Sequence, residues 1–316
     1  MRSLFIALSQ RRWPGFKYFF GSPPRCVAQV DDFGHYLRGM RNLLIHGLVM
    51  LSVHTGVHRV SSQSVIVEPL VSGEVLSFHS TRLDQPRKLN VQLPAGYSPD
   101  SAARYPVVYV LDGSAHEDFP HIAGLVQFMN MYDLYPKSIV VGIANVDRYH
   151  DFTHSTKGDS DLVWLPTGGG SAAFIEFIAE EVLPTIDRRY KTDGKRTIVG
   201  QSLGGLLGLQ LLVERPELFD DYVLVSPSLW WDNASLAARA VAFAKSRPTS
   251  PERVFIAMAK DDTPMRKPVA SVIAAFERHT RAPFKWRYMD FPKETHATIL
   301  HRAAYSGFEF LSGTAK

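Results

Sequence analysis

Apolar and polar positions follow two different patterns from about residue 65 onward. Residues 74–80 and 88–93 alternate with a period of two, which is typical of strands with one solvated face. Residues 106–111 and 138–143 are unbroken runs of mainly β-branched and aromatic side chains, as in strands covered on both faces. Further strands are predicted at residues 196–200, 222–226, 254–259 and 285–291.

Helical periodicity fills the intervals between these strands. Ser171 is predicted to cap a long amphipathic helix that runs through residue 189 and is kinked or ended by Pro184. The other predicted helices span residues 122–132, 203–213, 234–245, 269–279 and 301–311. Alternating strands and helices predict an α/β fold with a mostly parallel central sheet, helices on both faces, and the first two strands as an antiparallel edge.

The first 62 residues do not continue this pattern. Residues 1–39 have no regular period and predict an irregular extension lying upstream of the true start. Residues 40–62 resemble a signal peptide, with Met40 and a basic residue, then an apolar run, then Val60 and Ser62 at the −3 and −1 positions. A loosely packed N-terminal arm is the alternative. The catalytic domain is expected at residues 63–316.

The predicted location depends on that segment. With cleavage before Gln63, the protein is expected in the periplasm or outside the cell; without a signal peptide it is expected in the cytoplasm. The apolar run at residues 43–57 is interrupted by His46 and His54 and is too short to predict a membrane span.

Charge and cysteine content exclude some classes of function. The chain has 35 Lys/Arg and 31 Asp/Glu, but eight of the basic residues fall in residues 1–62, so the remainder is nearly neutral. This distribution argues against a nucleic-acid partner. Cys26 is the single cysteine, so residues 63–316 contain no disulfide and no thiol nucleophile.

Candidate chemistry begins at Gly200-Gln201-Ser202-Leu203-Gly204, where a predicted strand meets a predicted helix. A serine on such a turn is held in strained backbone geometry above the carboxyl ends of the strands, and nearby glycines let the backbone pass closely. The pattern is that of the nucleophile elbow of α/β-hydrolases. Ser202 is therefore the predicted nucleophile.

A serine nucleophile needs a base and an orienting acid, which follow it in this chain order in α/β-hydrolases. His296 lies in a loop after the last predicted strand, whereas His279 and His301 lie at helix ends, so His296 is the predicted base. Asp261 and Asp262 both follow the strand at residues 254–259. Asp262 is narrowly preferred as the acid, and Asp261 stays open; either could instead cap the following turn.

Other residues are expected around the nucleophile. The oxyanion hole is expected to use the N–H of Leu203 and that of Gly113 or Ser114. Arg148, Trp230 and Trp231 follow strand ends and are candidates for substrate binding, with an Arg148–Asp151 ion pair and packed tryptophans as alternatives.

No metal or cofactor is predicted. His150 and His154 have the spacing of metal ligands on a helix, but the residues between them read as a loop, and the chain has no HExxH motif.

Seven segments, met in order along the chain, carry a resemblance to a known family: LNVQLPAGY (89–97), VVYVLDGSAH (107–116), IVVGIANVDRYHDFT (139–153), FIAEEVLPTIDRRY (177–190), IVGQSLGGLLGL (198–209), RPELFDDYVLVSPSLWWDN (215–233) and ETHATILHRAAYSGFEFL (294–311). With these segments the sequence resembles the putative-esterase family of α/β-hydrolases, which includes siderophore trilactone esterases and esterase D-like enzymes. The resemblance implies that Ser202 is the nucleophile, that His296 is the base, and that the loop at residues 111–116 forms one side of the oxyanion hole. Gln201 and His154 depart from a histidine and a proline that are common in the family, and the position of the acid varies.

The predicted activity is hydrolysis of a small-molecule carboxylic ester through an acyl-enzyme on Ser202. A siderophore lactone and a small acyl or aryl ester are both open as substrates. The alternatives are an acyltransferase with an alcohol acceptor and a non-catalytic binding protein on the same scaffold. The oligomeric state is not predicted.

Overall fold

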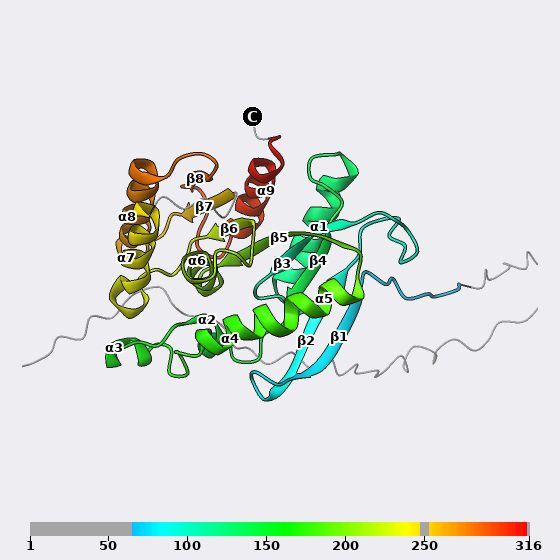
Figure 1. Ribbon diagram of the computed structural model, residues 1–316, viewed down its shortest axis with the longest axis horizontal. Coiled ribbons are helices and arrows are strands. Elements are labelled where there is room, and N and C mark those ends of the chain that lie inside the picture. Colours follow the sequence, from blue (N-terminus) through cyan, green and yellow to red (C-terminus); the bar gives the residue numbers. More distant parts are fainter. Residues whose placement is uncertain (1–64, 247–252, 315–316) are drawn as a thin grey trace, which may run out of the picture. The chain divides into compact units, whose positions relative to one another are not determined.

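An eight-stranded sheet runs through the computed structural model, which describes residues 65–246 and 253–314 (Figure 1). The strand order is β1-β2-β4-β3-β5-β6-β7-β8. The strands are β1 (Glu74–Ser80), β2 (Gln85–Gln92), β3 (Tyr105–Val110), β4 (Ile139–Ile143), β5 (Thr192–Gln201), β6 (Asp221–Val225), β7 (Arg253–Ala259) and β8 (Lys285–Phe291).

Strand β2 is antiparallel to both β1 and β4. The remaining strands β4, β3, β5, β6, β7 and β8, in their order in the sheet, are parallel to one another. This arrangement confirms the predicted mostly parallel sheet with an antiparallel edge. Its parallel strands bring their carboxyl ends to one edge of the sheet, where ligands of α/β proteins bind.

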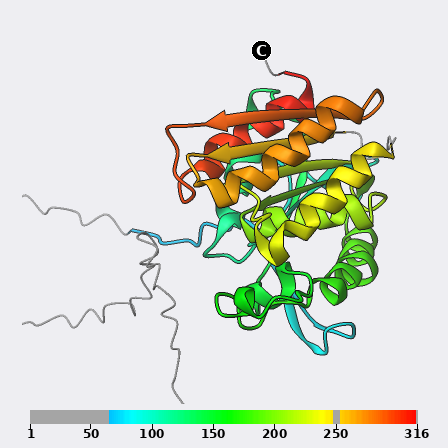
Figure 2. The same cartoon turned by 90° about the vertical axis from the view of Figure 1, so that its left-hand side faces the viewer.

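Helices cover both faces of this sheet. Helices α7 and α8 run side by side on one flank (Figure 2, yellow and orange). The helical segments are α1 (Asp118–Met131), α2 (Arg148–Phe152), α3 (Asp159–Leu162), α4 (Ser171–Phe177), η1 (Ile178–Val182), α5 (Leu183–Arg189), α6 (Leu203–Glu214), α7 (Trp231–Lys245), α8 (Thr263–His279) and α9 (Ile299–Ser312).

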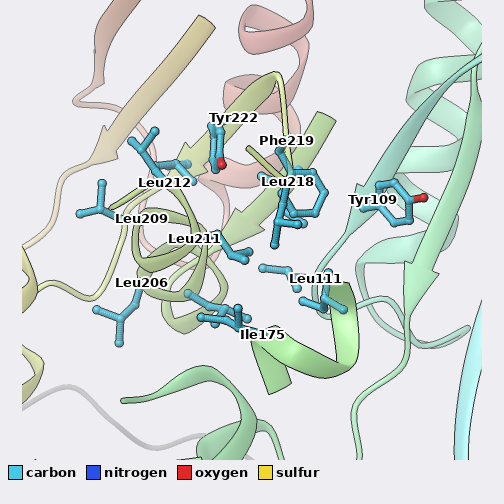
Figure 3. Close-up of a cluster of buried hydrophobic side chains, with 14 of the residues drawn as sticks. Tyr109, Leu111, Ile175, Leu206, Leu209, Leu211, Leu212, Leu218, Phe219 and Tyr222 are labelled. Atoms are coloured by element: carbon cyan, nitrogen blue, oxygen red, sulfur yellow. The ribbon is translucent and has the colours of Figure 1, made fainter. Parts of the chain in front are cut away.

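Successive side chains of each buried strand enter different hydrophobic cores. In β3, Tyr109 packs in the core formed with α4 to α8, while Val108 and Val110 pack in the core formed with α1 and α9. Figure 3 shows part of the first core, where Leu212 of α6 lies near Tyr222 and the ring of Phe219 lies between Tyr222 and Tyr109. A strand buried on both faces needs apolar residues at every position, which explains the unbroken apolar runs of the sequence.

The long helix predicted for residues 171–189 is present but changes its winding. A π-helical turn, η1, joins α4 to α5, with the N–H of Leu183 donating to the carbonyl of Ile178. Pro184 follows this turn; because it has no N–H and its ring needs space, a wider turn before it accommodates it. The predicted cap is wrong, since Gly170 is the capping residue and Ser171 Oγ donates to Gln210 Oε1 at 2.7 Å.

The predicted extension at residues 1–39 and the predicted signal peptide at residues 40–62 lie outside the described residues, and both stay predictions. Within the part of the chain that the structure describes, no helix is long and apolar enough to cross a membrane.

Candidate active site

The nucleophile elbow stands between β5 and α6. Ser202 has φ 60° and ψ −117°, a backbone conformation that is strained for any residue with a side chain. A Cβ at Gly200 would lie 2.4 Å from the carbonyl oxygen of Gly204, so glycine is required there. The strain and the close packing hold the serine at the carboxyl end of β5, directly before a helix N-terminus.

The candidate base contacts one of the two candidate acids. Nδ1 of His296 lies 2.9 Å from Oδ1 of Asp261, whose side chain is 4% exposed. Asp262 instead caps α8, accepting from the N–H of Met265 at 3.3 Å. The narrow preference for Asp262 is therefore not supported by the geometry, which brings Asp261 to His296.

Hydrogen bonds keep Asp261 ionised. Burial alone would raise the pKa of this carboxyl, but hydrogen bonds from His296 and Ser226 outweigh burial and hold the pKa below its ordinary value. Ser226 Oγ donates to Oδ2 of Asp261 at 2.7 Å and accepts from the N–H of Ala259 at 3.1 Å. Ser226 was not found from the sequence, where only its position after a buried strand could have indicated it.

The loop that carries His296 is attached to the elbow. The side-chain amide of Gln201, next to the nucleophile, donates to the backbone carbonyl of His296. The N–H of Lys260, next to Asp261, donates to the carbonyl of Glu294 at 2.9 Å. The departure from the family at Gln201 thus supplies a direct contact between the nucleophile turn and the base loop.

The two candidate oxyanion donors on the loop after β3 differ. The N–H of Gly113 donates to the carbonyl of Ile143 at 3.0 Å, which leaves no free N–H there and argues against Gly113. The N–H of Ser114 donates to a side-chain carboxylate, Oε2 of Glu117, at 3.2 Å. Leu203 is the first residue of α6, where an N–H has no acceptor within the helix.

Arg148 is bound to Asp112 in that loop. Its Nε and Nη2 atoms lie 2.5 and 2.8 Å from the two carboxylate oxygens of Asp112, and Nη2 lies 3.4 Å from the carbonyl of Gln201. The alternative pairing with Asp151 is wrong, because Asp151 forms a buried ion pair with Arg87 at 2.7 Å. Arg148 therefore joins the loop after β3 to the elbow, and its side chain keeps 30% exposure.

Two further carboxylates surround this ion pair. Burial, and then the negative charge of Asp112, raise the pKa of Asp118 to about 7. Burial would also raise the pKa of Glu117, but hydrogen bonds from Ser114 and Asn145 lower it overall. Three carboxylates thus gather near one guanidinium, and one of them is only partly ionised at neutral pH.

The two candidate tryptophans, Trp230 and Trp231, differ in burial. Trp231 is fully buried, and its Nε1 donates to the carbonyl of His154 at 2.8 Å, so it packs in the core as the alternative reading expected. Trp230 is half-buried and still offers surface to a ligand. Among the described residues, no three His, Cys, Asp or Glu side chains gather as a metal site.

A cavity of about 550 Å³ lies at the opposite edge of the sheet, lined by residues at the starts of strands such as Pro106, Asp221 and Arg253. It contains none of the candidate catalytic residues. The candidate catalytic residues Ser202 and Asp261 instead lie at the carboxyl ends of β5 and β7, with the loop after β3 and the segment after β6 beside them.

The chain is similar in sequence to known siderophore esterases. The chain is 33% identical over 180 residues to the ferri-bacillibactin esterase BesA of Bacillus subtilis, covering 51% of this chain and 61% of that protein. It is 32% identical over 139 residues to the siderophore enterobactin esterase of Emericella nidulans, covering 42% of this chain and 46% of that protein. The aligned regions thus span less than two thirds of either relative.

Solved structures extend the likeness to most of the domain. An IroE-like serine hydrolase from Shewanella oneidensis superposes with a TM-score of 0.67 at 28% identity, over 76% of this chain and 80% of that one. The BES protein from Bacillus cereus gives a TM-score of 0.67 at 25% identity, over 80% and 99% of the two chains. The sequence pattern of the family described as "Putative esterase" matches residues 80–310. The chain belongs to the putative esterase family of α/β-hydrolases.

Proposed function

We propose that this protein is a serine ester hydrolase in which Ser202 is the nucleophile, His296 the base and Asp261 the orienting acid. One arrangement carries the proposal. The strained elbow at Ser202 is joined through Gln201 to the loop of His296, and Nδ1 of His296 contacts the carboxylate of Asp261. The Asp261 contact assigns the proton of the ring to Nδ1 and leaves Nε2 as the basic nitrogen.

The reaction takes two steps. His296 accepts the proton of Ser202 while Oγ attacks the ester carbonyl, and the alcohol leaves with that proton. His296 then activates a water that releases the acid from the acyl-enzyme. The N–H groups of Leu203 and Ser114 are proposed to hold the oxyanion, with the oxyanion replacing the carboxylate of Glu117 at Ser114.

The proposed substrate is a siderophore ester or lactone. Support comes from the relatives, among which are the ferri-bacillibactin and enterobactin esterases. The exposed part of Arg148 and the half-buried Trp230 are the described side chains proposed to contact it.

Labelling with a fluorophosphonate probe, which reacts with activated serines, tests the mechanism. We expect wild type to be labelled on Ser202 and Ser202→Ala to be unlabelled, with loss of all but about one part in 10⁶ of the turnover of p-nitrophenyl esters. An unlabelled wild type, or equal labelling of the variant, would contradict the proposal and favour a binding protein. A panel of ferric trilactone and p-nitrophenyl esters then ranks the substrates by kcat/KM.

A further inference from the structure

A second serine lies against the candidate nucleophile. Oγ of Ser228 is 3.2 Å from Oγ of Ser202, and the N–H of Ser228 donates to the carbonyl of Ser202 at 3.0 Å. Ser228 is 3% exposed, so its hydroxyl is shielded from bulk water. Its hydroxyl and its N–H thus both contact the one residue proposed to attack the substrate.

The segment after β6 explains this placement. The N–H of Ser202 donates to the carbonyl of Val225 at 2.9 Å, which fixes the elbow to the end of β6. Ser226 then adopts φ 40°, a left-handed conformation that is unfavourable for serine. The resulting turn directs the hydroxyl of Ser226 to Asp261 and that of Ser228 to Ser202. Two serines of one short segment therefore contact the acid and the nucleophile.

A hydrogen-bond donor at the position of Ser228 stabilises negative charge that develops on Oγ of Ser202. As His296 removes the proton of Ser202, negative charge grows on Oγ before the carbon–oxygen bond is complete. A hydroxyl can donate one hydrogen bond, and such a bond is stronger to an ionised acceptor and in a site shielded from water. Among the described residues, Ser228 supplies the hydroxyl that lies within hydrogen-bond distance of this oxygen.

We propose that Ser228 is a further catalytic residue, whose hydroxyl donates a hydrogen bond to Oγ of Ser202 as that oxygen loses its proton. The proton of Ser228 stays on Ser228, and no bond to Ser228 is formed or broken. This inference rests on the proposed function, because it assigns Ser228 a role only if Ser202 attacks the ester.

The test compares Ser228→Ala and Ser228→Thr with wild type. We expect Ser228→Ala to lower the fluorophosphonate labelling rate and the kcat for p-nitrophenyl esters by about 10-fold to 100-fold, as for loss of a hydrogen bond to a charged group, with little change in KM. Ser228→Thr keeps the hydroxyl and should recover most of the rate. Ser271→Ala, which removes an exposed hydroxyl on α8, should label at the wild-type rate.

Thermal unfolding separates a catalytic role from a structural one, since the proposal expects Ser228→Ala to unfold close to the wild-type midpoint. If a folded Ser228→Ala is labelled as fast as wild type, or faster, the inference is overturned; faster labelling would mean that Ser228 restrains the nucleophile. If Ser228→Ala does not fold, a Ser228→Cys variant, of similar volume but with a weak donor, must show the same rate loss. Absence of labelling in wild type itself would instead overturn the proposed function.

Discussion

Two carboxylates at the same edge of the sheet hold a nitrogen base in similar geometry. Asp261 after β7 contacts the imidazole of His296 at 2.9 Å, and Asp112 after β3 contacts the guanidinium of Arg148 at 2.5 and 2.8 Å. Both carboxylates are largely buried, with side-chain exposures of 4% and 10%. The pairs differ in the partner, and that difference separates chemistry from positioning.

An imidazole gains and loses a proton near neutral pH, whereas a guanidinium stays charged. In the proposed mechanism the pair of Asp261 and His296 therefore moves the proton of Ser202. The pair of Asp112 and Arg148 cannot transfer a proton in this way, and through the contact with Gln201 it fixes the loop after β3 to the elbow. Similar distances thus support two different functions.

Among variants of these two ion pairs and their neighbours, the largest effect is expected from Asp261→Asn. The amide keeps the shape but can donate to Nδ1, which favours the wrong tautomer of His296, so kcat should fall by about 10³-fold to 10⁴-fold. Steady-state hydrolysis of p-nitrophenyl acetate measures this. Asp262→Asn is the matched control and should retain activity, because asparagine also caps a helix. A larger loss in Asp262→Asn would reverse the assignment of the acid.

A second effect concerns stability near Arg148. Because the pKa of Asp118 is raised to about 7 in the folded protein, the native state binds more protons than the unfolded state from about pH 4 to pH 7. Stability from this group therefore declines as pH rises through that window. Asp118→Asn should remove the decline, so that the variant gains up to about 4 kcal/mol over wild type between pH 4 and pH 8.

Urea unfolding of both proteins at pH 5 and pH 8 measures the difference. Asp100→Asn, at an exposed turn, controls for the loss of a surface carboxylate. An equal pH dependence of wild type and Asp118→Asn would show that Asp118 is ionised throughout this range.

The smallest effect is expected from Arg148→Lys. Lysine keeps the charge but cannot bind both oxygens of Asp112 in a planar fork, so the loop after β3 should lose its fixed position. We expect kcat/KM to fall by about 10-fold to 100-fold, mainly through kcat. Asp112→Asn should give a similar loss, and the double variant should add little to it. A rise in KM with unchanged kcat would show instead that Arg148 chiefly binds substrate.

The sequence alone determined how strands and helices succeed one another along the chain, and it indicated two candidate catalytic residues. The period of the apolar residues depends on which faces are buried, so it predicted the eight strands and the antiparallel edge. Ser202 and His296 were indicated because an elbow needs its glycines and because chain order in this fold is fixed. The strands, the helices and the elbow depend on neighbours in the chain, and the choice of His296 depends on the chain order.

Tertiary structure decided the choices between adjacent residues and between partners. Asp261 and Asp262 are consecutive residues of the same type. The backbone directs Asp261 to His296 and Asp262 to the start of α8, and the residue type alone does not predict these directions. Other contacts likewise join segments far apart in the chain. Arg148 pairs with Asp112, Ser228 contacts Ser202, and Trp231 is buried with its Nε1 bonded to the carbonyl of His154. Such contacts arise only when the sheet brings its strand ends together, because packing between distant segments fixes side-chain directions that local sequence leaves open.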